Sequence, residues 1–273
     1  MVPKVSVVTP VYNGEAHFET AIPSILGQSL DDFEFIIVDD GSQDRTPHLL
    51  RELAAKDHRV RPLFPGRVGF AAACNFGIAH ARGEYIARQD FDDRSYPDRL
   101  RLQVDFLDRN PATGVVGGYY VLVDQNRAER YVRMPPTSHA EIIRAMARYI
   151  PMAHTVTTFR RAVWVEAGGY PESNNLVDLR FWLRIATLGW HFANLPEIIG
   201  EHFVYEASYF HRSFHYRQRQ RELAGVQSEI IRQLNLPRWM YAYSVGRYAY
   251  AYFPTPLKRV IRRTLGGSKE RDL

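Results

Sequence analysis

Three carboxylates stand together at residues 90–93, where the sequence reads Asp-Phe-Asp-Asp directly after a short apolar run. Side chains two residues apart on an extended segment project to the same side, so Asp90 and Asp92 repel one another unless a cation lies between them. Mg²⁺ and Mn²⁺ bind one or two carboxylates and keep their other positions for water and phosphate oxygens. The cluster therefore predicts a divalent metal site that also receives a nucleotide diphosphate.

A structural alternative is open for this segment. The same residues could form an acidic, solvated turn before a helix, with Ser95 as the N-cap and Pro97 in the first turn. The pattern of the surrounding N-terminal half favours the metal site.

Short apolar runs alternate with amphipathic segments over residues 5–110, which predicts strands separated by helices. Strands are expected at 5–9, 33–38, 60–64 and 85–89, and helices at 16–26, 46–55, 71–81 and 97–110. Helical crossovers of this kind predict a parallel sheet that is covered on both faces. Ligands bind beyond the carboxyl ends of such strands, and this is where the polar stretches 9–13, 39–44 and 90–93 lie.

The regular alternation is lost after residue 110. Strand-like and helical segments follow in an irregular order, at 115–123, 129–133, 139–149, 161–167, 178–188, 190–195 and 208–234. Pro237 is the best candidate for a domain boundary, because it separates a polar helical region from an aromatic and basic tail.

Length and composition describe a globular chain: 273 residues, of which 45% are hydrophobic, can bury a sizeable core. The one cysteine, Cys74, stands among alanines and cannot form an internal disulfide, so we expect a buried thiol. The N-terminus lacks the basic region of a signal peptide, and no apolar stretch is long enough to predict a transmembrane helix.

The net charge of +5 is concentrated in residues 238–273, which hold eight Lys or Arg side chains against two acidic ones. A nucleic-acid-binding protein would more often spread basic residues over its folded domain and carry a recognisable module. Neither feature is found, so no nucleic-acid partner is expected.

Taken in order, six segments resemble the inverting family 2 glycosyltransferases of the GT-A fold, over roughly residues 3–205. They include Val-Asp-Asp-Gly-Ser at 38–42, and the full set is 5–13, 35–46, 75–78, 83–87, 90–93 and 178–184. The resemblance implies an α/β GT-A fold with a mostly parallel, Rossmann-like sheet, helices on both faces and a C-terminal helical tail. It also implies transfer of a hexosyl group from a nucleotide diphosphate donor to an acceptor hydroxyl, with inversion.

The same resemblance implies a domain organisation. A catalytic domain would span 1–237, with a nucleotide-binding half at 1–110, an acceptor-binding half at 111–207 and a helical extension at 208–237. The aromatic and basic tail, 238–273, would follow it.

By this resemblance, Thr9, Pro10 and Tyr12 form a base and ribose pocket together with Asp39 and Asp40. A ring N–H of uracil needs an acceptor, for which Asp40 is preferred, and the ring of Tyr12 can cover a base face. The structural alternative for Asp39 and Asp40 is that their side chains form and cap a turn.

The resemblance places Asn75 in the nucleotide site and Asp90 toward the ribose or a metal-bound water. Asp92 and Asp93 would hold Mn²⁺ or Mg²⁺, whose role is to neutralise the charge on the departing diphosphate. Assignment among the three carboxylates stays open.

Relatives often carry an arginine directly before the asparagine of this third loop, where the present chain has Cys74. Arg67 or Arg88 could supply the missing phosphate contact, although surface exposure is the ordinary expectation for each. His154 could lie near the donor sugar or could be a structural histidine with its hydrogen bonds satisfied.

Asp178 is the expected general base. An inverting displacement needs a carboxylate that takes the acceptor proton, and burial can raise the pKa of an Asp toward that task. Phe181, Trp182 and Ile185 follow at helical spacing, so Asp178 could also serve as a helix N-cap. The two roles are compatible.

The tail has aromatic residues near helical spacing, followed by basic ones: Trp239, Tyr243, Tyr250, Phe253, Lys258, Arg259, Arg262 and Arg263. This pattern is typical of a peripheral anchor on an anionic membrane. It also fits an aromatic face that packs on the catalytic domain or on a second subunit. Arg247 and the Pro-Thr-Pro sequence at 254–256 interrupt the helical pattern.

These observations predict a metal-dependent inverting enzyme that moves one sugar from a UDP-sugar to a glycan or lipid-linked acceptor in cell-envelope, capsule or O-antigen polysaccharide synthesis. Single transfer is favoured because the Gln-x-x-Arg-Trp signature of processive synthases is absent. The expected location is cytoplasmic, at the inner face of the membrane. Two alternatives are a sugar-nucleotide pyrophosphorylase, which normally carries a Gly-rich phosphate loop, and a non-catalytic glycan-binding protein.

Overall fold

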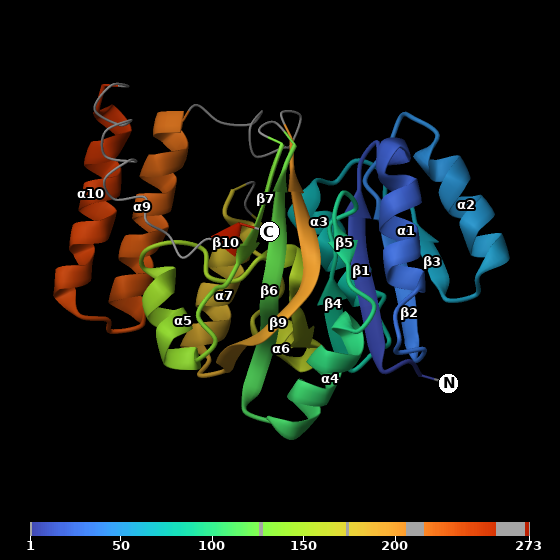
Figure 1. Cartoon of the computed structure of the whole chain (residues 1–273), viewed down its shortest axis with the longest axis horizontal. Helices are drawn as coiled ribbons and strands as arrows, with labels where there is room; N and C mark the ends of the chain where they lie inside the picture. The colour runs from blue at the N-terminus through green and yellow to red at the C-terminus, as the bar shows by residue number, and fades with distance from the viewer. Residues whose placement is uncertain (1, 126–127, 173–174, 206–215, 255–270, 273) are drawn as a thin grey trace.

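The computed structural model describes residues 2–125, 128–172, 175–205, 216–254 and 271–272. Over these residues the chain forms one ten-stranded sheet with helices on both faces, and two further helices pack beside each other at one end (Figure 1). The α/β class expected from the sequence is confirmed.

The N-terminal half supplies a parallel part of the sheet. Its strands are β1 (Val5–Val11), β2 (Phe33–Asp39), β3 (Val60–Leu63) and β4 (Tyr85–Arg88), and β1 lies between β2 and β4. All three pairings are parallel, as the alternation of strands and helices predicts.

The second half adds mixed pairings. Its strands are β5 (Arg94–Ser95), β6 (Thr113–Asp124), β7 (Glu129–Arg133), β8 (Thr158–Arg160), β9 (His191–Val204) and β10 (Arg271–Asp272). β8 joins the two halves, because it is antiparallel to both β4 and β6. The sheet is therefore parallel in the N-terminal half and mixed beyond it, where β6 is parallel to β9 and antiparallel to β7 and β8.

Helices follow most of the strands. They are α1 (Phe18–Leu26), α2 (Thr46–Lys56), α3 (Phe70–Ala79), α4 (Arg99–Arg109), α5 (His139–Met146), α6 (Arg161–Glu166), α7 (Val177–Thr187), α9 (Tyr216–Gln233) and α10 (Tyr241–Tyr252). Three short 3₁₀ turns are η1 (Glu15–His17), η2 (His154–Val156) and η3 (Arg238–Met240).

Two hydrophobic clusters bury the faces of the sheet. Val7 of β1 points into a cluster shared with α1, α2 and α4, whereas its neighbour Val8 points into a cluster shared with α3, α7 and α9. Successive side chains of a strand alternate between faces, so one strand contributes to both cores.

Helix α3 lies very close to the sheet at Gly77. A Cβ at this position would be 2.7 Å from a methyl carbon of Val8 and 2.8 Å from one of Val38. Only a glycine permits this approach, which brings the N-terminal end of α3 next to the strand ends.

Two details differ from the sequence-based expectations, at Ser95 and Arg247. Ser95 is not an N-cap but lies in β5 and pairs with β9, and α4 has Asp98 at its N-cap. Arg247 does not interrupt a helix but lies within α10. Pro237 separates two elements that pack together, since Met240 is buried in the same hydrophobic cluster as residues of α9.

Parts of the C-terminal predictions lie outside the described residues. These are positions 208–215 of the expected helical region and the basic residues at 258–263. Within the described ranges, no helix combines the length and the hydrophobicity needed to cross a membrane.

Candidate active site

The carboxyl ends of β1, β2 and β4 lie at one edge of the sheet, so the polar stretches that follow them are neighbours. Val11 is paired with Asp39 at the ends of β1 and β2. Beyond this pair, the backbone N–H of Asn13 donates to Oγ of Ser42 at 2.8 Å. The predicted grouping of residues 9–13, 39–44 and 90–93 at one edge is confirmed.

The carboxylate of Asp40 is held by its own surroundings. Its Oδ1 accepts hydrogen bonds from the backbone N–H groups of Val68 at 2.6 Å and Gly69 at 2.9 Å, and its Oδ2 is paired with Arg67. Asp40 therefore holds the loop between β3 and α3 in place through hydrogen bonds and an ion pair. Asp39 is less occupied, since Oδ1 accepts the N–H of Ser42 at 3.0 Å and no other hydrogen bond to its carboxylate is recorded among the described residues.

Tyr12 presents a half-exposed ring beside these aspartates. The guanidinium of Arg67 lies 3.8 Å from the centroid of that ring, a cation–π contact. The side chain of Thr9 is fully buried in the sheet, and Pro10 is partly exposed. The surface available to a planar ring at this edge is thus made by Tyr12 and Arg67.

Arg88 is fully buried beneath the carboxylate cluster, contrary to the expectation of surface exposure. Its guanidinium donates to the carbonyl oxygens of Val8 and Gln89, both at 2.7 Å, and pairs with Asp90. Burial of a charge is tolerated here because the guanidinium is paired and hydrogen-bonded. Asp90 is consequently fixed at the end of β4. Burial raises its pKa, but the charge and hydrogen bond of Arg88, together with His154 and His202, outweigh burial and hold the pKa below the ordinary value.

His154 and Tyr170 complete the buried network around Arg88. Nε2 of His154 lies 2.6 Å from the hydroxyl of Tyr170 and 3.4 Å from Nε of Arg88. Burial and the charge of Arg88 lower the pKa of His154 to about 3, so the imidazole is neutral and Nε2 is an acceptor. The structural interpretation of His154 is supported.

Asp92 is the carboxylate whose protonation is most affected by its neighbours. Burial and the charges of Asp93 and Asp90 raise its pKa to about 7. Oδ2 of Asp92 accepts a hydrogen bond from the hydroxyl of Tyr205, and the ring of Tyr205 stacks on His17 with 5.4 Å between ring centroids. A divalent cation would relieve this repulsion among carboxylates.

Asp93 is fully buried and is engaged by the end of β9. Its Oδ1 accepts the backbone N–H of Phe203 at 2.8 Å, and its Oδ2 lies 2.9 Å from Nδ1 of His202. The nearby Asp93, together with the other carboxylates, raises the pKa of His202 to about 9. Asp93 therefore fixes His202 at the edge of the cluster.

His202 and Tyr205 were not identified from the sequence. Each lies more than a hundred residues away from the carboxylate that it contacts. The strand predicted at 190–195 ends well before both residues, whereas β9 extends over His191–Val204, so its true length gave no local signal.

Asp178 lies at the second position of α7, not at its N-cap. The N-cap is Leu176, which has a left-handed backbone with φ of 52°, and Oδ1 of Asp178 accepts the N–H of Leu179 at 2.8 Å. Burial, reinforced by the negative charge of Asp90, raises the pKa of Asp178 to about 6. The start of α7 thus brings a carboxylate of raised pKa into the electrostatic field of the cluster.

The side chain of Asn75 is hydrogen-bonded within the protein. Its amide nitrogen donates to the carbonyl oxygen of Tyr170, and its amide oxygen accepts N–H groups of Trp164 and Tyr170 at 3.1 Å and 2.8 Å. Its side chain ties α3 to the segment after α6. Cys74, beside it, is buried as expected, and burial raises the pKa of its thiol to about 11.

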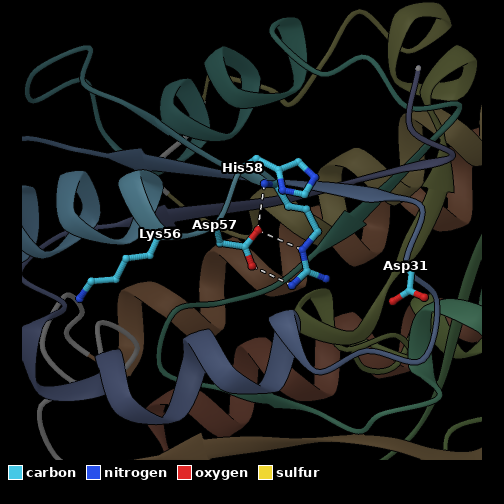
Figure 2. A pocket seen from close by; sticks show the side chains of 5 residues that line it. Asp31, Lys56, Asp57 and His58 are labelled. Atoms are coloured by element: carbon cyan, nitrogen blue, oxygen red, sulfur yellow. Dashed lines mark hydrogen bonds and ion pairs between the residues drawn. The ribbon is translucent and has the colours of Figure 1, made fainter.

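A separate hollow of about 450 Å³ lies between the end of α2 and the start of β3 (Figure 2). Its side chains include Lys56 and His58, and Asp57 is paired with Arg59. Because these residues precede β3, the hollow is at the amino end of the parallel strands, opposite the carboxylate cluster.

Comparison with known proteins identifies the family. Residues 6–168 match the family model described as Glycosyl transferase family 2. The chain belongs to this family. It is accordingly a glycosyltransferase, and the enzyme class expected from the sequence is confirmed.

The curated relatives of this family 2 glycosyltransferase are bacterial. The putative glycosyltransferase EpsE of Bacillus subtilis is 30% identical over 274 residues, which cover 98% of the present chain and 96% of EpsE. The amylovoran biosynthesis glycosyltransferase AmsE of Erwinia amylovora is 28% identical over 200 residues, covering 71% and 74% of the two chains.

Solved structures share the fold at low sequence identity. The mannosyltransferase PcManGT from Pyrobaculum calidifontis, in complex with GDP-Man and Mn²⁺, gives a TM-score of 0.65 at 21% identity, covering 97% of this chain and 80% of PcManGT. Residues 1–349 of S. aureus TarS, in complex with UDP-GlcNAc, give a TM-score of 0.68 at 16% identity, covering 96% and 80%. The GT-A fold is therefore confirmed for this family 2 glycosyltransferase.

Proposed function

We propose that this enzyme transfers a single sugar from a UDP-sugar to an acceptor hydroxyl, with inversion and with the help of a divalent cation. The observation that carries the proposal is the place of Asp178 near the start of α7, where burial, reinforced by the negative charge of Asp90, raises its pKa to about 6. A general base and a candidate diphosphate site thus share one edge of the sheet.

Asp178 is proposed as the general base. A carboxylate with a pKa of about 6 is ionised at neutral pH, yet it is a stronger base than an exposed aspartate. It would accept the proton of the acceptor hydroxyl while that oxygen attacks the anomeric carbon from the face opposite the diphosphate. The position of Asp178 near the start of α7 fixes the direction from which the acceptor must approach.

The nucleoside is proposed to bind between Tyr12 and the Arg67–Asp40 pair. Asp40 has its oxygens engaged by Val68, Gly69 and Arg67, so we assign the contact with the uracil N–H to Asp39 instead. Arg67 would then contact the base or ribose side of the donor, since it stacks on Tyr12.

Asp92 and His202 are the side chains best suited to hold the cation. Carboxylate oxygens and imidazole nitrogens are suitable ligands for Mn²⁺, and Nδ1 of His202 lies against Asp93, so Nε2 is the nitrogen that faces a metal. Because the pKa of His202 is raised to about 9, the cation would have to displace the proton from Nε2 on binding. Among the described residues, no three ligand side chains already converge as a metal-binding group. Donor phosphates and water would therefore complete the coordination, and the cation would stabilise the charge on the departing diphosphate.

In this proposal Asp93 is a positioning residue for His202 and not a direct ligand. Asp90 is held by Arg88 at the end of β4 and faces the ribose or a metal-bound water. Tyr205 has to release Oδ2 of Asp92 before a cation can bind to that oxygen.

The names of the relatives support a class of donor and a class of product. AmsE is named for amylovoran biosynthesis and TarS was solved with UDP-GlcNAc, which supports polysaccharide synthesis and a uridine donor. PcManGT was solved with GDP-Man and Mn²⁺, so guanosine donors belong in the test. The acceptor in this proposal is a glycan or a lipid-linked saccharide, reached from the cytoplasmic face of a membrane.

Thermal-shift measurements with a panel of UDP- and GDP-sugars, with and without Mn²⁺, test the proposal directly. A ligand that binds the native state raises the melting temperature, so a UDP-sugar should stabilise the protein more in Mn²⁺ than in its absence. Hydrolysis of the same donor should follow. A preference for GDP-sugars would overturn the uridine assignment, and an absence of any metal effect would overturn the cation site.

A further inference from the structure

Helices α9 and α10 present an aromatic and basic surface to solvent, which the proposed chemistry does not use. We call it the α9–α10 face and define it by six residues: Arg217, Arg221, Trp239, Val245, Tyr248 and Tyr252. Trp239 lies in η3, directly before α10, and the other five line a common groove. Trp239 and Val245 are each 65% exposed, and Tyr248 and Tyr252 are 45% and 46% exposed. Large apolar side chains gathered on one surface commonly mark an interaction site.

The face contains a groove of about 1050 Å³ between the two helices. The guanidinium of Arg217 lies 5.7 Å from the ring centroid of Tyr252, and that of Arg221 lies 6.0 Å from the centroid of Tyr248. Each arginine thus lies over an aromatic ring and lines the groove, which also contains Glu222, so the charged side chains of the groove are two positive and one negative.

The helix pair that carries this face is firmly attached. Met240 of η3 is buried, and so are Ser244 and Ala251 on the inner side of α10. Arg247 donates to the side-chain oxygens of Gln227 at 2.9 Å and Gln220 at 3.0 Å. The helix α10 is therefore packed against the rest of the protein, and its exposed aromatic residues lie on its outer side.

The charge of this region identifies the kind of partner. The elements α9, η3 and α10 contain six arginines and two glutamates, namely Arg217, Arg219, Arg221, Arg232, Arg238, Arg247, Glu222 and Glu229. The sequence that follows residue 254 adds four basic residues at 258–263. Tyrosine and tryptophan favour the interface between water and a bilayer, and clustered basic residues are attracted to anionic lipids.

We propose that the α9–α10 face binds the surface of an anionic phospholipid membrane, with a lipid phosphate in the groove between Arg217 and Arg221. Figure 1 shows that α9 begins and α10 ends at the same side of the molecule as the carboxyl ends of β1 and β2. Binding in this orientation holds the candidate active site close to the bilayer. This inference rests on the proposed function, because it gives a lipid-linked acceptor a short route to Asp178.

Vesicle sedimentation of the full-length protein tests the proposal. The vesicles are phosphatidylcholine alone, or phosphatidylcholine with about a quarter of phosphatidylglycerol, at low salt where electrostatic attraction is least screened. The protein should pellet with the anionic vesicles and remain in solution with the neutral ones. The double variant Arg217→Gln/Arg221→Gln should lose roughly ten-fold in partition coefficient or more. A second double variant, Trp239→Ser/Val245→Ser, should also bind more weakly, since it removes the apolar contacts.

A charge-matched variant provides the control. Arg51→Gln/Lys56→Gln removes two exposed positive charges from α2, at the other end of the molecule (Figure 1), and should bind vesicles as the wild type does. Melting temperatures establish that all the variants are folded. Wild-type protein that stays in solution with anionic vesicles overturns the proposal, and so does an Arg217→Gln/Arg221→Gln variant that pellets like the wild type. Self-association through Val245 without vesicle binding would assign the face to a second copy of the chain instead.

The test is independent of the proposed chemistry. Vesicle binding requires no nucleotide sugar, and hydrolysis of a UDP-sugar in solution requires no membrane. Hydrolysis without vesicle binding would show that the membrane assignment is wrong. Vesicle binding without hydrolysis would show that the catalytic assignment is wrong.

Discussion

Nδ1 of His202 lies 2.9 Å from Oδ2 of Asp93, although the two residues are 109 positions apart in the sequence. This contact brings the end of β9 against the carboxylate cluster that follows β4. Because Nδ1 is engaged by Asp93, Nε2 is the ring nitrogen of His202 that is left to face a cation. The candidate metal site is therefore built from two distant segments of the chain.

Replacement of Asp92 by Asn should weaken the metal-dependent binding of UDP. The substitution keeps the side-chain volume but removes the carboxylate. The pKa of that carboxyl group is about 7, because Asp92 is buried beside other carboxylates. Calorimetry in Mn²⁺ should show a loss of roughly ten-fold or more in UDP affinity. Asp105→Asn, on α4 and outside the site, should bind UDP as the wild type does, and equal affinity in both variants would remove Asp92 from the metal site.

The pH dependence of transfer should report the ionisation of Asp178. The folded-state pKa of about 6 lies above the ordinary value of 3.8. The base is active only when ionised, so kcat/KM should rise between about pH 5 and pH 7 and level off above that. The sign for stability is opposite. The folded state binds the proton more tightly, so stability falls as pH rises from the ordinary pKa of 3.8 through the folded-state pKa of about 6. Rates at saturating Mn²⁺ that do not change with pH would contradict the assignment.

Replacement of Arg88 by Lys should destabilise the protein. A lysine keeps the charge but cannot reproduce the hydrogen bonds to Val8 and Gln89 together with the pairing to Asp90. Urea denaturation should show a loss of about 2–4 kcal/mol in the free energy of unfolding. Arg101→Lys, in an exposed ion pair with Asp98, should change it by less than about 0.5 kcal/mol. Similar stabilities of the two variants would show that the buried network contributes little.

Two glycine substitutions should have opposite effects on stability. Gly77→Ala places a Cβ within 2.7 Å of Val8 and should cost about 1–3 kcal/mol, because α3 has to move away from the sheet. Gly225 lies in α9 with open space around its Cα, so Gly225→Ala should stabilise by up to about 1 kcal/mol. Thermal melts of both variants measure the difference, and a neutral Gly77→Ala would argue against the close approach of α3.

The sequence predicts the parallel half of the fold well, because apolar periodicity and strand ends are local signals. Asp39, Asp90 and Asp92 could be grouped at one edge without any coordinates, since parallel strands place their carboxyl ends together. The antiparallel joining strand β8 gave no such signal, because it is three residues long and its partners are distant.

The remainder of the site depends on contacts between residues far apart in the sequence. His202 and Tyr205 become site residues only when β9 pairs with β5 and β6. Arg88 was expected at the surface because arginines usually are, but carbonyl oxygens at the strand ends and Asp90 together satisfy its guanidinium. Asp178 could be identified as a helix-start residue, whereas its exact place relative to the N-cap depends on the left-handed backbone of Leu176.

The central claim, that Asp178 takes the acceptor proton, is tested most directly by Asp178→Asn. The asparagine oxygen can still accept the N–H of Leu179, and Leu176 remains the N-cap, so α7 should stay folded. Removal of a buried charge should leave the melting temperature unchanged or raise it. Glu141→Gln, a comparable change in the first turn of α5, controls for the loss of a charge at a helix start.

The decisive measurement is the rate of sugar transfer by Asp178→Asn at saturating donor and Mn²⁺, together with its affinity for UDP. We predict a fall of about two to four orders of magnitude in kcat, with the affinity for UDP unchanged and Glu141→Gln as active as the wild type. Transfer by Asp178→Asn at a rate close to that of the wild type would contradict the account, because the proton would then have to go to a different group.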